Sequence, residues 1–105
     1  MIARIWHSTT RLANAESYLE YLNHFVIPGY QAAEGNRGVF IMTEYQGELA
    51  CFLLLTFWVS EDALKKYIGI PGDVVNPNPD EKNLLVAFES TARHYKVIES
   101  LEEGG

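Results

Sequence analysis

Residues 51–58, CFLLLTFW, form a strand-length run in which nearly every position is apolar. A strand with one wet face alternates apolar and polar side chains. This run does not alternate, because one face carries Phe52, Leu54, Thr56 and Trp58 and the other carries Leu53, Leu55 and Phe57. We therefore expect both faces of this strand to be covered, by helices on one side and by something else on the other.

Two stretches have the spacing of amphipathic helices. In residues 15–27 the apolar positions Tyr18, Leu19, Leu22, Phe25 and Val26 recur every three or four residues, which predicts a helix. Asn14 is its expected N-cap, and the Pro28-Gly29 pair is expected to end or kink it. A second helix is predicted at 61–69, with Ser60 as its cap, acids in its first turn, lysines in its last and Gly69 at its end.

The remaining pattern predicts strands and two irregular segments. Strands are expected at 1–10, 39–46, 48–59 and 92–100, with a hairpin turn in 45–48. Residues 34–38 are predicted as a loop, and residues 70–83 as a long, proline-rich binding loop or lid. Within 80–88 we expect a short helical turn capped by Asp80, and residues 101–105 are expected to be a frayed tail after a single domain of residues 1–100.

The order strand, helix, strand, strand, helix, strand fits an α+β fold of the ferredoxin-like type, with one four-stranded antiparallel sheet. The first and third strands are central, the fourth flanks the first, and the second lies at an edge. Both helices cover the same face, which leaves an apolar face open. A second copy of the chain is the simplest cover, so a homodimer through the sheet face is predicted.

Charge and cysteine content narrow the partners. The 105 residues carry a net charge of −6, which disfavours nucleic acid and anionic membrane surfaces. The single cysteine, Cys51, cannot form an internal disulfide, which favours a reducing compartment and a cytoplasmic location. No run of the sequence has the length of a membrane span. We read Cys51 as a small apolar residue of the strand.

The start of the chain, MIARIWHSTT, the middle, FLLLTFWVSEDALKKYIG, and the later ARHYKV together resemble the antibiotic biosynthesis monooxygenase (ABM) family. The most specific segment is TFWVSEDAL, an apolar strand that ends in an aromatic residue and Trp before a Ser and an acid-rich helix start. The resemblance implies a dimeric α+β barrel with a ligand pocket between the sheet and the helices. The family includes cofactor-independent oxygenases of polycyclic phenols, quinol oxygenases and haem-degrading enzymes.

The resemblance also suggests positions for functional residues. The haem-degrading members use an Asn on the first strand, a Trp late in the second helix and a His soon after it. Here His7 stands near the first position, Tyr67 near the second and the loop around Asn76 near the third. No histidine lies between Leu64 and Arg93, so the haem ligand is missing from the sequence. We expect no cofactor, although the resemblance leaves haem or flavin open.

His7 is the main catalytic candidate. It shares a strand face with Ala3 and Ile5, and if that face looks toward the helices it enters the pocket. There it would act as a base or orienter with a near-neutral pKa, and otherwise it is a strand-end residue bonded to backbone or solvent. His94 is expected on a neighbouring strand, where it could face His7, but no third ligand at suitable spacing supports a metal site.

The other candidates are aromatic or basic. Tyr67 and Asn76 are expected to bind substrate oxygens, and Trp6 and Trp58 to form a pocket wall, although aromatic residues also fill ordinary cores. Arg4 is placed on the dimer face by its alternation with Ile2 and Trp6. Arg37 either binds an anionic substituent or, with Asn36, shapes a turn.

Two functions remain open from the sequence. The first is a cofactor-independent monooxygenase that deprotonates an aromatic phenol or quinol and holds it against O₂ in a dry pocket. The second is a non-catalytic binding or regulatory module of the same dimeric fold, because fold alone does not determine function.

Overall fold

The computed structural model describes residues 1–69 and 74–98 of the chain. In this part, five strands form one antiparallel sheet: β1 (Ile2–Arg11), β2 (Asn36–Gln46), β3 (Leu49–Trp58), β4 (Leu85–Phe88) and β5 (Arg93–Lys96). The strand order is β2-β3-β1-β4, and β5 also pairs with β1. The expected α+β, ferredoxin-like arrangement is confirmed, with β1 and β3 central and β2 at an edge. The predicted tail at 101–105, residues 70–73 of the predicted loop and the end of the predicted last strand lie outside the described residues.

The first helical region is longer than predicted and has four parts. It starts with a 3-10 turn, η1 (Leu12–Asn14), and continues as α1 (Ala15–Tyr21), the π-helical η2 (Leu22–Val26) and α2 (Ile27–Ala32). Pro28 lies in the first turn of α2, so Pro28-Gly29 does not end the helix. Proline has no N–H for a bond to the preceding turn, and the wider π turn directly before it accommodates that loss.

The helix caps agree with the sequence in one case out of three. Ser60 caps α3 (Glu61–Ile68), since its Oγ accepts from the Ala63 N–H at 3.1 Å. Asn14 precedes α1, but its side chain makes no cap hydrogen bond. The prediction that Asp80 caps the later turn is wrong, because Asn78 Oδ1 accepts from the Glu81 N–H at 3.0 Å and α4 (Pro79–Lys82) starts one residue before Asp80.

The last edge of the sheet differs from the prediction of a helical turn followed by one strand. The helical part ends at Lys82, and β4 then pairs with residues 8–10 of β1. After an interruption at 89–92, β5 pairs with residues 2–5 of the same strand. In the interruption, Val74 forms a bridge with Thr91 and the Val75 N–H donates to the Ser90 carbonyl at 2.9 Å. The Glu89 N–H still donates to the His7 carbonyl of β1 at 3.0 Å, and the edge is interrupted where Ser90 and Thr91 pair with residues 74–75.

The predicted loop at 34–38 is shorter in the structure. Gly35 takes a positive φ of 86°, which a residue with a side chain rarely adopts, and β2 starts directly after it at Asn36. The register of β2 on β3 shifts between Asn36 and Gly38, so Arg37 is the extra residue of a bulge.

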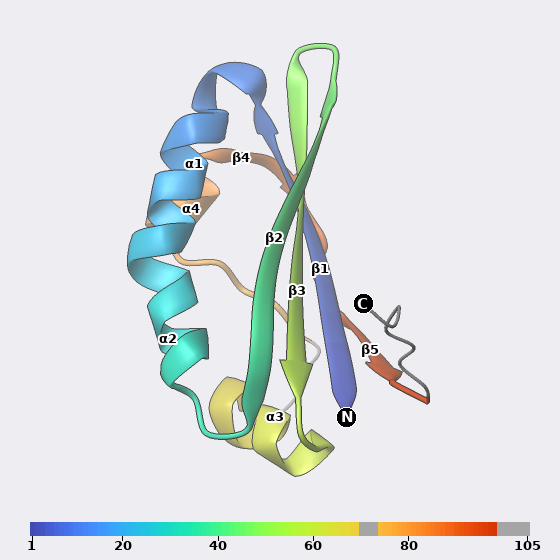
Figure 1. The fold of residues 1–105 in the computed structure, drawn as a ribbon. Coiled ribbons are helices and arrows are strands. Elements are labelled where there is room, and N and C mark those ends of the chain that lie inside the picture. The colour runs from blue at the N-terminus through green and yellow to red at the C-terminus, as the bar shows by residue number, and fades with distance from the viewer. Residues whose placement is uncertain (70–73, 99–105) are drawn as a thin grey trace, which may run out of the picture.

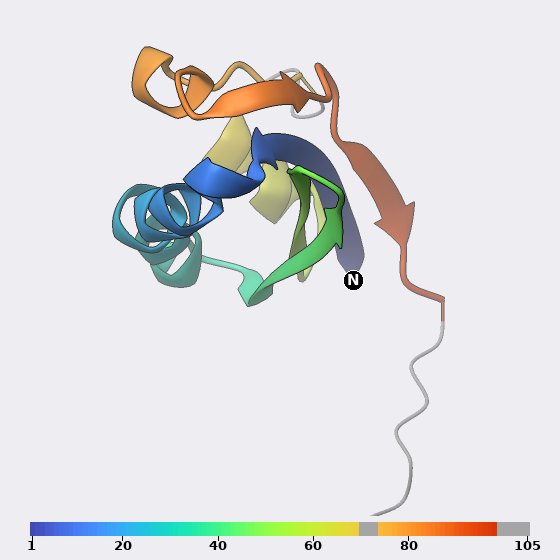
Figure 2. The ribbon, with the colours of Figure 1, turned by 90° about the horizontal axis from the view of Figure 1, so that it is seen from above.

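All the helices cover one face of the sheet, and the opposite face is open (Figures 1 and 2). On the covered face, side chains of β1 and β3 pack with the helices in two clusters. The buried members of the two clusters are Ile2, Tyr30, Leu54, Trp58 and Leu64, and Ala15, Tyr18, Leu22, Ala50 and Phe52. On the open face the apolar side chains of β3 remain half-buried, and Phe40 and Met42 of β2 are exposed. The helices therefore cover one face of β3, as the apolar pattern of residues 51–58 predicted. The apolar side chains on its other face have no cover within the described part of the chain.

The Ser60 cap provides a test of local stability. Ser60→Ala removes the oxygen that accepts from Ala63 and should lower the free energy of unfolding by about 1 kcal/mol, as measured by urea denaturation. Ser60→Asn keeps an acceptor and should be nearly neutral. Equal effects of the two substitutions would contradict a role for the cap.

Candidate functional site

A buried arginine and three aromatic residues lie together between the sheet and the helices. The Arg4 guanidinium Nη1 donates to the Tyr30 hydroxyl at 3.2 Å. The Tyr30 ring lies 6.1 Å from Trp58 and 5.3 Å from Tyr67, and Trp58 and Tyr67 are 5.6 Å apart between ring centres. Arg4 is 5% exposed and Trp58 is fully buried, whereas Tyr67 is 43% exposed. We call these four residues the interior site, and Tyr67 marks where it reaches the surface.

Several elements hold the interior site in place. Arg4 and Trp58 belong to the paired strands β1 and β3, and the Trp58 indole N–H donates to Thr56 Oγ1 at 2.9 Å. Tyr30 comes from α2 and Tyr67 from the last turn of α3. Gly29 leaves room for Tyr67, because a Cβ at residue 29 would meet the Tyr67 hydroxyl. A side chain at residue 29 would displace the Tyr67 hydroxyl from its place in the interior site.

Burial raises the pKa of Tyr30, and the Arg4 charge opposes that rise. Tyr67 and Glu81 act in the same direction as burial. Tyr30 therefore stays a neutral phenol at ordinary pH and does not neutralise Arg4.

Glu81 forms a second buried polar cluster on the same face. Tyr18 donates to Glu81 Oε2 at 3.0 Å, and Ser8 Oγ lies 2.9 Å from the Tyr18 hydroxyl. Burial raises the pKa of Glu81, and the hydrogen bond from Tyr18 only partly offsets this. Burial also raises the pKa of Tyr18. These three residues join β1, α1 and α4, and they bring a carboxyl of elevated pKa into a dry environment, as a proton acceptor requires.

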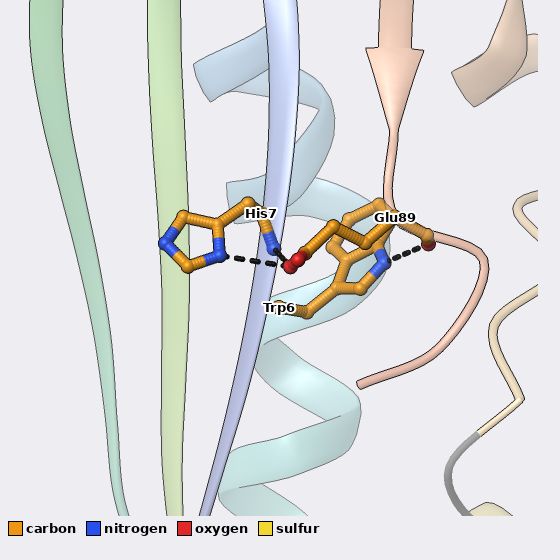
Figure 3. Close-up of polar contacts among 3 residues, drawn as sticks. All are labelled: Trp6, His7 and Glu89. Atoms are coloured by element: carbon orange, nitrogen blue, oxygen red, sulfur yellow. Dashed lines mark hydrogen bonds and ion pairs between the residues drawn. The ribbon is translucent and has the colours of Figure 1, made fainter. Parts of the chain in front are cut away.

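Glu89 is the centre of a third group, shown in Figure 3. Its Oε1 accepts from the His7 backbone N–H at 2.9 Å and lies 2.8 Å from His7 Nδ1. Its backbone carbonyl accepts from the Trp6 indole N–H at 2.6 Å. Although partial burial raises the pKa of Glu89, the hydrogen bonds and charge of His7 outweigh it and lower the pKa. This group fixes the first residue of the broken edge onto β1.

The structure separates His7 from the other predicted catalytic residues. Trp6 is buried on the helix side, and the adjacent His7 points to the open face, where it borders a hollow of about 190 Å³ with Met42, Cys51 and Leu53. Tyr67 lies on the helix side, so His7 and Tyr67 do not line one cavity within a chain. The condition for His7 to enter the pocket is therefore not met. The placement of Arg4 on the dimer face is wrong for the same reason, since even-numbered residues of β1 face the helices.

The structure also shows where the remaining candidates lie. Trp6 and Trp58 share the helix side of the sheet, and Trp58 contacts Tyr67. Asn76 is exposed in the segment that pairs with the broken edge. His94 is exposed and pairs with Arg4 across the strands, so it does not face His7. Arg37 is exposed at the β2 bulge, and Asn36 Oδ1 accepts from the Gly38 N–H at 3.0 Å, which supports the turn interpretation.

The three histidines of the chain lie outside the interior site. The chain has three histidines: His7 is on the open face, His24 borders an outer groove and His94 is exposed. None belongs to the interior site, which leaves a haem iron without a histidine ligand there. In residues 1–69 and 74–98 no three His, Cys, Asp or Glu side chains gather as a metal site would require. Over the same residues no helix has the length and apolarity to span a membrane.

Comparisons with known proteins agree on the fold. No protein-family model matches the sequence, and no curated protein matches it. Solved structures do match. A protein from Deinococcus radiodurans, provisionally named an antibiotic biosynthesis monooxygenase, has a TM-score of 0.72 at 15% identity over 100% of both chains. A variant of SnoaB, a cofactor-independent oxygenase from Streptomyces nogalater, has a TM-score of 0.66 at 14% identity over 97% of both chains.

A third match is MhuD, a heme-degrader from Mycobacterium tuberculosis with two hemes bound in its active site. Its TM-score is 0.62 at 17% identity, over 97% of this chain and 100% of MhuD. These likenesses confirm the resemblance at the level of fold: the chain has the fold of the antibiotic biosynthesis monooxygenase structures.

Sequence reasoning missed the roles of Glu81, Glu89 and Tyr30. Glu81 and Glu89 look like ordinary charged surface residues in the sequence, and no spacing links either of them to its partner far along the chain. Tyr30 follows the Pro28-Gly29 pair, and no pattern in the sequence links it to Arg4.

The raised pKa of Glu81 predicts how stability changes with pH. A carboxyl with a folded-state pKa above its ordinary value of 4.5 holds its proton longer in the folded protein than in the unfolded chain. Its contribution to stability is therefore full below that value and is lost as the pH rises through the folded-state pKa. Glu81→Gln should remove this loss and be at least as stable as the parent at pH 7, as measured by urea denaturation between pH 4 and 8.

Glu20→Gln, on the exposed side of α1, is the matched control and should follow the parent. A parent and a Glu81→Gln variant with parallel pH profiles would show that burial does not disfavour the Glu81 carboxylate.

Proposed function

We propose that this protein is a cofactor-independent monooxygenase of the antibiotic biosynthesis monooxygenase family, acting on a small aromatic phenol or quinol bound at the interior site. One observation carries the proposal: a buried guanidinium, Arg4, lies among the aromatic rings of Tyr30, Trp58 and Tyr67. The rings offer flat apolar contact, and the cation stabilises negative charge that forms on a bound oxygen. The fold shared with SnoaB, which is a cofactor-independent oxygenase, supports this choice.

Glu81 is the proposed proton acceptor. Its carboxyl is buried and has a raised pKa, so its carboxylate is a stronger base than one in water. Tyr18 and Ser8 hold it in position. We assign substrate binding to Tyr67 and Trp58, whereas Asn76 and His94 would act only from the rim, because both are exposed.

The reaction balances without a cofactor. The base removes a proton from a ring CH₂ group of the keto tautomer, and Arg4 stabilises the resulting enolate. The enolate carbon is oxidised by O₂ to a peroxide, which then loses water. One oxygen of O₂ becomes a carbonyl on the substrate, and the other leaves as water with the two hydrogens. Exclusion of bulk water by the buried site protects the anion from simple reprotonation.

The rival function is a binding or regulatory module of the same fold. It is favoured by the position of His7, the predicted base, on the face opposite the interior site. In this case an aromatic ligand would still occupy the interior site, but no oxygen would be consumed. Binding without turnover separates the two functions.

Oxygen uptake with a panel of naphthoquinols and anthrones tests the proposal. The parent should consume O₂ with at least one of them, and Glu81→Gln should reduce the rate by roughly 10²-fold or more, the usual effect of losing a general base. His7→Ala should keep the rate within a few fold of the parent.

A rate that survives Glu81→Gln but falls with His7→Ala would return the role of base to His7. If the parent binds a quinol, detected by quenching of Trp58 fluorescence, and consumes no O₂ with any member of the panel, the binding module is the better description.

We also propose that two copies of the chain associate through the open sheet face, in the cytoplasm. Odd-numbered residues of β3 and Phe40 and Met42 of β2 make much of this face apolar, and Phe40 and Met42 are about half exposed. Covering it with the same face of a second copy would remove that apolar surface from water. The lone Cys51 lies on this face as well and fits a reducing compartment.

Light scattering after gel filtration should give about twice the chain mass of 11.9 kDa at micromolar concentration. Leu53→Asp should give a folded monomer, because it would bury an unpaired charge in the interface. Leu19→Asp, a matched change at a partly exposed leucine of α1 on the helix side of the sheet, should leave the mass unchanged. A parent of single-chain mass, or a Leu53→Asp variant of double mass, would contradict this interface.

A further inference from the structure

Arg4 is a buried cation, and no carboxylate of residues 1–69 or 74–98 forms an ion pair with it. Its one hydrogen bond there goes from Nη1 to the hydroxyl of Tyr30, a neutral group. Its Nε is buried and has no hydrogen-bond partner. An uncompensated buried charge is strongly unfavourable, so such an arrangement calls for an anion that is not part of the described structure.

Neighbouring groups do not supply that anion. Tyr30 stays protonated because burial raises its pKa. Glu81 accepts its hydrogen bond from Tyr18, in the separate cluster with Ser8. Glu89 is bonded to His7 on the other face of β1. None of these described groups supplies the acceptor that Nε lacks, and we therefore consider a ligand as its source.

The surroundings of Arg4 indicate the rest of the ligand. Tyr30, Trp58 and Tyr67 present aromatic rings within 5.3–6.1 Å of one another, and the ring of Tyr67 is partly exposed at the surface. The rings already pack against one another, so an aromatic ligand would contact them from the side where Tyr67 is exposed, with its charged group toward Arg4 at the inner end.

We propose that the interior site is selective for aromatic molecules that carry a negatively charged oxygen when they bind, with that oxygen accepting from Arg4 Nε. The ligand is thus an aromatic carboxylate, or a phenol or enol acidic enough to bind as its anion, rather than a neutral quinol. This inference rests on the proposed function for the location of the ligand, and it narrows the substrate class from aromatic phenols to acidic ones.

Two probes of nearly equal shape test the selectivity: 2-naphthoate, an anion at pH 7, and 2-naphthamide, which is neutral. Dissociation constants are measured by titration calorimetry and by quenching of tryptophan fluorescence. The parent should bind 2-naphthoate at least about tenfold more tightly, the effect of one charge-assisted hydrogen bond in a dry site. Arg4→Met keeps most of the side-chain volume and should bring the two constants within about threefold of each other.

Arg11→Met is the matched control, because Arg11 is on the same strand but exposed at its end. It should keep the preference of the parent. Arg4→Lys keeps the charge but lacks the Nε donor, so it should retain part of the preference for 2-naphthoate. If a thermal melt shows that Arg4→Met does not fold, Arg4→Lys serves as the test in its place.

Equal binding of the two probes by the parent, binding of neither, or an unchanged preference in Arg4→Met would each overturn the inference. Its failure is distinct from failure of the proposed function. If the protein consumes oxygen with a neutral anthrone but shows no preference for 2-naphthoate, only the proposed anion selectivity is contradicted. A clear preference for 2-naphthoate without any oxygen uptake removes only the monooxygenase activity.

Discussion

The register of β1 on β3 is the constraint on which the rest of the structure depends. Ile2 pairs with Trp58 and Arg11 with Leu49, without interruption between them. Since side chains alternate between the two faces of a strand, this register places Arg4, Trp6 and Ser8 under the helices and His7 on the open face. A shift of one residue would exchange the two sets, so the register determines which chemical groups are dry and which are accessible.

On the covered face, buried hydrogen bonds add to apolar packing in holding the helices against the sheet. Arg4 bonds to Tyr30, and Ser8 and Glu81 bond through Tyr18. These contacts hold three helical segments against one strand and carry ionisable groups into the core. Ordinary core packing does not need a guanidinium or a carboxyl, whereas charge stabilisation and proton transfer do. Burying these ionisable groups lowers stability but serves the proposed chemistry. Their hydrogen bonds offset part of the loss of stability.

Much of the fold was predictable from the sequence, because periodicity and turn residues act locally. The two long strands, the hairpin at Gly47 and the helix capped by Ser60 all follow from such signals. The sequence did not show which face of β1 would pack against the helices. Ile2, Ile5 and Trp6 put apolar side chains on both faces, so the alternation of apolar and polar residues did not distinguish the buried face. Of the predicted site residues, Trp58 and Tyr67 come together at the interior site. Glu81 could not have been foreseen there, because its partners Tyr18 and Ser8 are more than 60 residues away in the sequence.

The broken edge of the sheet has a consequence for behaviour at high concentration. An exposed edge strand offers unpaired N–H and C=O groups to another molecule, and short or interrupted edges offer few. On the side of β1 the edge consists of two four-residue strands, β4 and β5, and between them Ser90 and Thr91 pair with residues 74–75. On the opposite side, β2 runs for eleven residues, and its only break is the bulge at Arg37, close to its start. Aggregation by strand addition, where it occurs, would therefore begin at β2.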